Sequence, residues 1–230
     1  MLIRAPFTER ELAVAQLVRR DYEMGTKVMM PLTTIEALND ECFRNYQTVH
    51  ADQLILKVAS FGTQEQYFDP GGFQPAADFA VEAVEKWLQR YQMRLDSPVV
   101  LHPVRNMVLP PATFYQELLP ALNALDLPLS LDLGMVVADL RNWGEAHREA
   151  ILTAIREISP SIGLFWVSGV YDAGPAELPC ACQPVVDEVW ELLTTLDKPQ
   201  QGVVVMTDRL ASDAQFEQDL QILTKYLDEE

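Results

Sequence analysis

The chain has 230 residues, of which 49% are hydrophobic and 22% are charged, so it is long enough to bury a large core. Its formal net charge of −17 excludes nucleic acid and anionic membrane surfaces as partners, because both carry charge of the same sign. It leaves a small molecule or a protein as the expected partner. Three cysteines make no disulfide framework, and no apolar run reaches the length of a membrane span, so we expect a cytoplasmic protein.

The first half of the chain alternates between strand and helix patterns. Thr8 is placed to cap a helix, and Glu11 completes a capping box with it. Cys42 falls in a helical pattern as a buried thiol, and the turn signal at 69–72 lies in a long predicted loop at 61–74. The predicted strands are 1–5, 27–31 and 52–60, and the predicted helices are 8–23, 33–49 and 75–94.

The second half continues the same alternation. A loop is predicted from the end of the strand at 128–132 to Asn142, and another at 169–183. Cys180 and Cys182 in the second loop are too close for the usual zinc half-site. The predicted strands are 98–102, 128–132, 161–168 and 203–206, and the predicted helices are 112–125, 145–158, 184–196 and 213–227.

Most of these predicted strands are continuous apolar runs, which is typical of a parallel sheet covered by helices. We count seven such strands and find no linker or shift in composition between them. The pattern therefore predicts a single α/β domain over 1–230. A closed barrel and a doubly wound sheet both fit this alternation.

Polar side chains follow the apolar strands at the ends where α/β barrels place their chemistry. His102, Asp132 and Lys57 are the candidate catalytic residues, because a His–Asp pair can carry out general acid–base chemistry near neutral pH. A structural network is the alternative interpretation, in which His102 and Asp132 bond to each other or to Arg105. The candidate ligand-binding residues are Arg105, Ser168, Thr207, Asp208 and Arg209.

The order of motifs from residue 98 onward resembles a known group of barrels. The motifs are Val100-Leu101-His102-Pro103, Leu131-Asp132-Leu133-Gly134, the segment 166–170, the helix 184–190 with the sequence PVVDEVW, and Met206-Thr207-Asp208. They resemble the xylose-isomerase-like TIM barrels and, more narrowly, the multinuclear-iron, peptide-modifying oxygenases of the methanobactin-biosynthesis type. The resemblance covers about residues 98–228. It implies a TIM-type (β/α) barrel in which seven strands are evident, one short of eight.

The resemblance also implies an iron site, and this chain departs from it at most of the matched positions. The family binds iron through histidines and carboxylates at strand ends, which are ligands that suit iron. Here His102 and Met206 stand for glutamates, and Trp166 and Val170 stand for two histidines. Asp132 is retained, with Asp208 as a flanking acid. We therefore expect neither a metal site nor a cofactor.

Two functional hypotheses follow from these departures. The first is a degenerate, metal-free barrel that acts as a binding or accessory protein, a pseudoenzyme that kept the fold. The second is an isomerase- or lyase-type enzyme that acts on a small sugar or acid through His102 and Asp132, with Lys57 beside them. Metal content separates the first hypothesis from an iron enzyme, and replacement of His102 tests the second.

Overall fold

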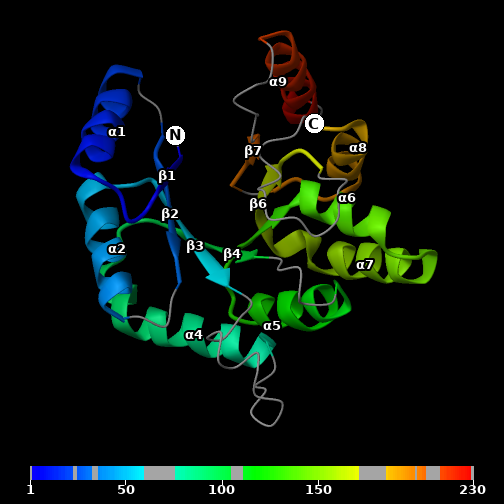
Figure 1. The fold of residues 1–230 in the computed structure, drawn as a ribbon, viewed down its shortest axis with the longest axis horizontal. Coiled ribbons are helices and arrows are strands. Elements are labelled where there is room, and N and C mark those ends of the chain that lie inside the picture. Colours follow the sequence, from blue (N-terminus) through cyan, green and yellow to red (C-terminus); the bar gives the residue numbers. More distant parts are fainter. Residues whose placement is uncertain are drawn as a thin grey trace. The chain divides into compact units, whose positions relative to one another are not determined.

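A computed structural model describes most of the chain (Figure 1). The described residues are 2–22, 25–32, 36–59, 76–104, 111–170, 185–199, 201–205 and 213–228. The chain forms two compact units, and the boundary between them runs through Leu129 in β5. The first unit consists of Met1–Leu109 and Glu117–Leu129, and the second of Pro110–Gln116 and Ser130–Glu230. The expectation of a single domain stays a prediction.

Strands and helices alternate through both units. The elements up to the boundary are β1 (Leu2–Arg4), α1 (Glu9–Tyr22), β2 (Lys27–Pro31), α2 (Glu36–Val49), β3 (Gln53–Ala59), α4 (Ala76–Tyr91), the 3₁₀ turn η1 (Gln92–Arg94), β4 (Val99–Val104), the π-helix η2 (Thr113–Leu118), α5 (Leu119–Asn123) and β5 (Leu129–Asp132). The remaining elements are α6 (Leu133–Asn142), α7 (Glu145–Ile158), the 3₁₀ turn η3 (Ser159–Ser161), β6 (Ile162–Val167), α8 (Asp187–Thr195), β7 (Val203–Val205) and α9 (Asp213–Asp228). Over these described ranges, no helix combines the length and apolar character needed to cross a bilayer.

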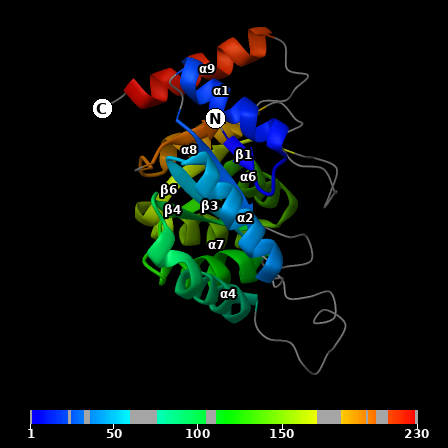
Figure 2. The same cartoon turned by 90° about the vertical axis from the view of Figure 1, so that its left-hand side faces the viewer.

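The strands of the described residues pair in sequence order from β1 to β7. Each pair with a resolved register is parallel, as the continuous apolar runs predicted. In the first unit, α1 and α2 lie on one side of β1, β2 and β3 (Figures 1 and 2). The parallel βα alternation predicted from the sequence is therefore confirmed.

The capping box predicted at the first helix is also confirmed. The backbone N–H of Thr8 donates to Glu11 Oε2 at 2.7 Å, and the N–H of Glu11 donates to Thr8 Oγ1 at 3.3 Å. The hydrogen bonds that Glu11 accepts from Thr8 lower the pKa of its carboxyl group. Local sequence alone was enough here, because both partners lie within one turn.

An aromatic cluster joins α2 to α4 in the core of the first unit. Phe43 stacks on Tyr91 with ring centroids 4.5 Å apart, and Trp87 meets Phe43 edge to face at 6.0 Å. Such pairs add stability beyond the area that they bury. Cys42 beside them is fully buried, as predicted, and burial raises the pKa of its thiol.

The structure corrects the prediction of a loop up to Asn142. Residues Leu133–Asn142 form α6, which starts directly at the end of β5. The sequence reads LGMVVADLRN, with six of these ten residues buried. Its buried residues Leu133, Val136, Val137 and Leu140 follow the helical i, i+3, i+4, i+7 spacing, so the sequence carries a helix signal that the loop prediction missed.

The helix predicted at 112–125 is irregular. Thr113–Leu118 is a π-helix, and α5 follows with Pro120 in its first turn. Proline has no backbone N–H to donate to the carbonyl one turn earlier, so the regular α-helical ladder breaks before it. The π-helix then places Tyr115 in the core of the second unit.

Tyr115 is bound there by a buried hydrogen bond, which is the basis of our first prediction. Its hydroxyl donates to Asp139 Oδ2 on α6 at 3.0 Å, and both residues are buried. We expect Tyr115→Phe to lower the free energy of unfolding by about 1–2 kcal/mol, since a buried acceptor loses a donor. Urea denaturation followed by circular dichroism measures the change.

Tyr226 provides a matched control for this prediction. Its hydroxyl oxygen is buried on α9 and has no hydrogen-bond partner within the described part of the chain. Tyr226→Phe therefore removes no hydrogen bond of this kind, and we expect unchanged or slightly higher stability. Equal losses in the two variants would contradict a special role for the Tyr115–Asp139 bond.

Candidate functional site

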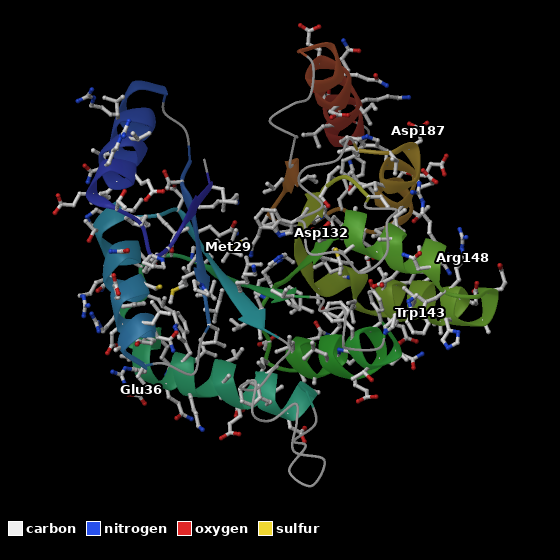
Figure 3. All side chains as sticks on the ribbon, viewed as in Figure 1. Met29, Glu36, Asp132, Trp143, Arg148 and Asp187 are labelled. Atoms are coloured by element: carbon white, nitrogen blue, oxygen red, sulfur yellow. The ribbon has the colours of Figure 1, made fainter. Side chains whose placement is uncertain are left out.

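Asp132 lies where β5 ends and α6 begins, and its side chain caps that helix (Figure 3). The carboxylate oxygen Oδ1 accepts hydrogen bonds from the backbone N–H groups of Gly134 at 3.0 Å and Met135 at 3.3 Å. The hydroxyl of Ser168, just after β6, donates to the same oxygen at 2.5 Å. Two predicted site residues, Asp132 and Ser168, are therefore brought together from strands that are distant in sequence.

The Asp132 carboxylate is poorly solvated, and this shifts its pKa. Burial raises the pKa of Asp132, because it disfavours the charged form. The hydrogen bonds from Ser168 and the two backbone N–H groups act in the opposite direction and lower the pKa, but burial is the larger effect. Ser168 itself has no exposed surface. The arrangement matches a helix N-cap as well as it matches a catalytic acid.

Gly134 allows the close approach of α6 to the segment after β6. A Cβ atom at this position would lie 2.2 Å from Ser168 Oγ, 2.6 Å from the carbonyl oxygen of Gly169 and 2.7 Å from that of Ser168. Two of these three contacts are with backbone, which cannot rotate away. A side chain at position 134 is therefore incompatible with the observed Asp132–Ser168 contact.

The positions matched to iron-binding histidines do not fit a metal. Trp166 is 1% exposed in β6, and Val170 is 5% exposed beyond its end. Neither side chain offers the imidazole nitrogen that an iron site would use. Within the ranges that the structure describes, no three His, Cys, Asp or Glu side chains are grouped as metal ligands. The described residues of the strand ends therefore do not provide the iron site that the resemblance implies.

Lys57 and His102 lie side by side in the first unit, on neighbouring strands. They are register partners of the parallel pair β3 and β4, so their side chains leave the same face of the sheet. Lys57 is exposed and His102 is half-buried, whereas Leu56 and Val58 on the other face are buried. β4 continues to Val104, two residues beyond the predicted end of this strand at His102, and the proposed role of the two residues stays a prediction.

The remaining predicted site residues have different outcomes. Arg105, Thr207, Asp208 and Arg209 lie outside the described residues, as do Met206 and the Cys180–Cys182 loop. His102 belongs to the first unit and Asp132 to the second. A catalytic His102–Asp132 pair therefore stays a prediction.

A surface groove between α2 and α4 is a feature that the sequence did not indicate. It encloses about 240 Å³. Arg90 at its edge pairs with Glu36 at 2.9 Å and with Asp40 at 2.7 Å, and Lys86 pairs with Glu82 at 2.5 Å. Because these charges neutralise one another, they single out no class of ligand. The lining residues are Leu32, Glu36, Asn39, Phe79, Glu82, Ala83, Lys86, Trp87, Arg90 and Tyr91.

Comparison with solved structures identifies the fold. The TTHB071 protein from Thermus thermophilus, soaked with ZnCl2, superposes with a TM-score of 0.55 and 14% identity over 97% of this chain and 88% of that chain. Endonuclease IV from the same organism superposes with a TM-score of 0.53 and 12% identity over 97% of this chain and 84% of that chain. The fold is that of a TIM-type (β/α) barrel.

The described residues contain seven strands, whereas a closed barrel of this type has eight. The coarser part of the resemblance drawn from the sequence is thereby confirmed. No protein-family model matches this chain. No curated protein matches it either. At identities of 12–14% the solved structures establish the fold and leave the function to the residues themselves.

Proposed function

We propose that this protein is a metal-free barrel that acts as a binding or accessory protein and not as a metalloenzyme. The observation that carries the proposal is the burial of Trp166 and Val170 at the positions matched to iron-binding histidines. Apolar side chains packed at such positions occupy the space of former ligands. They also strengthen the core, since a buried tryptophan or valine contributes several kcal/mol of transfer free energy, about 1.5–3 for a side chain such as valine.

The bonding of Asp132 supports the same proposal. Its Oδ1 atom already accepts three hydrogen bonds, two of them from the first turn of α6. A carboxylate in this role stabilises the helix start through both hydrogen bonding and the helix dipole. Recruiting Oδ1 to a substrate or metal would leave these donors without their acceptor.

The finer family assignment is part of this proposal. We propose that the chain derives from the multinuclear-iron, peptide-modifying oxygenases of the methanobactin-biosynthesis type. The support is the PVVDEVW sequence and the order of the strand-end motifs. The described part of this sequence leads into α8 (Asp187–Thr195), where Val189 and Trp190 are buried. A pseudoenzyme of that descent would keep these packing residues while losing the metal ligands.

Metal analysis of the purified protein tests the proposal. The protein is produced in medium supplemented with iron, zinc and manganese, dialysed, and measured by inductively coupled plasma mass spectrometry. We expect each metal far below one equivalent per chain, because Trp166 and Val170 provide no ligand. About one or more equivalents of iron, zinc or manganese that survive dialysis would overturn the proposal.

The isomerase- or lyase-type enzyme remains the second candidate, and the adjacency of Lys57 and His102 favours it. A lysine beside an imidazole at the C-terminal end of barrel strands is a suitable pair for proton transfer. On this hypothesis, His102→Ala abolishes turnover of a small sugar or acid and leaves the circular dichroism spectrum unchanged. A variant that changes only the stability would contradict the enzyme and agree with the binding protein.

A further inference from the structure

The neighbouring positions of Lys57 and His102 carry an inference about what the protein binds. Both residues lie close to the C-terminal ends of their strands, two residues before Ala59 in β3 and before Val104 in β4. This is the end of a parallel sheet at which α/β proteins bind their ligands. The inference rests on the proposed binding function, because it names the class of ligand for that function.

Lys57 and His102 interrupt an otherwise apolar face of the sheet. On the same face of the sheet, the preceding register partners Ile55 and Val100 are fully buried. Lys57 is exposed although Leu56 and Val58, its neighbours in β3, are 0% and 1% exposed. The face is therefore accessible at Lys57, where the apolar surface gives way to polar groups.

The chemistry of the pair selects an anion. A lysine ammonium offers three donors and no acceptor, and an imidazole nitrogen adds a further donor beside it. Neighbouring strands lie about 4.8 Å apart, so one oxyanion can be reached by both side chains. The surrounding chain carries 34 acidic and only 17 basic side chains. The two residues are thus a basic pair in a chain with an excess of acidic residues.

We propose that Lys57 and His102 form a binding site for the oxyanion of a small ligand, a carboxylate or a phosphate. Charge-assisted hydrogen bonds from the ammonium and the imidazole hold the anion. Ile55 and Val100, the preceding residues on the same face, are fully buried, so contact with the ligand falls to Lys57 and His102. A small organic acid or a phosphorylated small molecule carries the anionic group that this pair would hold.

Nuclear magnetic resonance of the histidine ring protons tests the site directly, because the full chain has only three histidines. His50 has a side chain that is 80% exposed, and His147 is exposed on α7, so both act as internal controls. The protein is titrated with sodium phosphate in one series and disodium succinate in another, each at constant ionic strength set with sodium chloride. A His102→Gln variant assigns the His102 resonance.

We expect the His102 resonance to shift and saturate with at least one of the two anions, while the His50 and His147 resonances change little. Whichever of phosphate or succinate binds more tightly identifies the source of the oxyanion. Lys57→Gln should weaken this binding about tenfold, as expected for the loss of a charge-assisted hydrogen bond, and Lys57→Arg should retain most of it. Lys86→Gln on α4 is the matched control, because Lys86 pairs with Glu82 on the same helix, and it should have no effect.

Parallel, unsaturated shifts of all three histidines would overturn the inference, as would an unchanged affinity in Lys57→Gln. These outcomes are separate from those of the metal analysis. If the protein is metal-free but binds no anion, the proposed function stands and the proposed anion site is refuted. If an anion binds at His102 and is then chemically converted, the anion site stands and a purely binding role is refuted.

Discussion

Replacing Gly134 by alanine is expected to lower the free energy of unfolding by at least about 2 kcal/mol, and replacement by valine by more, as for overpacked cores. The added Cβ would lie 2.6 Å and 2.7 Å from two backbone carbonyl oxygens. Relief requires that α6 and the segment after β6 move apart. Such a movement also stretches the hydrogen bond between Ser168 and Asp132. Urea denaturation followed by tryptophan fluorescence measures the loss.

Gly144→Ala is the matched control for this prediction. Gly144 is the N-cap of α7 and has a negative φ of −61°, and a Cβ there would meet no atom within 4 Å. Replacing glycine lowers the conformational entropy of the unfolded chain, which stabilises the folded protein. Alanine caps a helix less well than glycine, which destabilises it. The two effects partly cancel, so we expect a change within about 1 kcal/mol. Equal effects of the two substitutions would show that the close approach at Gly134 does not matter.

Replacing Asp132 by alanine is the second large effect that we expect, with a loss of about 2–4 kcal/mol. The variant loses an N-cap, which costs about 0.5–2 kcal/mol. It also leaves the fully buried Ser168 hydroxyl without its acceptor, which costs about 1–3 kcal/mol. Ser168→Ala removes the hydroxyl together with its hydrogen bond to Asp132 but keeps the helix cap. This variant should therefore lose less stability than Asp132→Ala. Chemical denaturation of both variants measures the difference.

Asp132→Asn separates the capping role of Asp132 from its charge. Asparagine caps helices as well as aspartate does, and it has no negative charge to bury. We therefore expect the stability of this variant at neutral pH to lie within about 1 kcal/mol of the wild type. A loss as large as that of Asp132→Ala would show that the charge itself stabilises the fold and would contradict a purely capping role.

The pH dependence of the same pair has a definite sign. Burial raises the pKa of Asp132 in the folded state above its value in the unfolded chain. The stability linked to this group is therefore fully present below the unfolded pKa and is lost as the pH rises through the folded pKa. Relative to Asp132→Asn, the wild type should lose stability as the pH is raised above the ordinary aspartate pKa of about 4 and through the higher pKa of the folded state. A constant difference across this range would contradict a raised pKa.

The strands of the sheet could be predicted from the sequence because the patterns that indicate them are local. The runs around Leu54, Leu101 and Phe165 are apolar on both faces, as buried parallel strands require. Thr8 and Glu11 likewise reveal a helix start within four residues. These local patterns also placed His102 and Asp132 near the ends of neighbouring predicted strands, which is why they were recognised as candidates.

The helix α6 shows where such local reading fails. Leu133, Val136, Val137 and Leu140 are buried at the i, i+3, i+4, i+7 spacing of a helix. The helix was missed because it begins directly after Asp132, with no connecting turn between strand and helix, and because Gly134 weakens helix propensity at its start. The helix forms because its tertiary surroundings cover it and because Asp132 satisfies the first N–H groups.

Local sequence patterns were therefore enough to predict the alternation of strands and helices, and the resemblance of the motifs from residue 98 onward supplied the barrel. The contacts of the candidate site residues could be found only in the folded chain. Folding joins Ser168 to Asp132 across 36 residues of chain and places the Asp132 carboxylate at the start of α6 as its cap. It also places Lys57 beside His102. The physical reason is that strand and helix patterns depend on neighbours within a few residues, whereas hydrogen-bond partners and burial depend on which distant segments pack together.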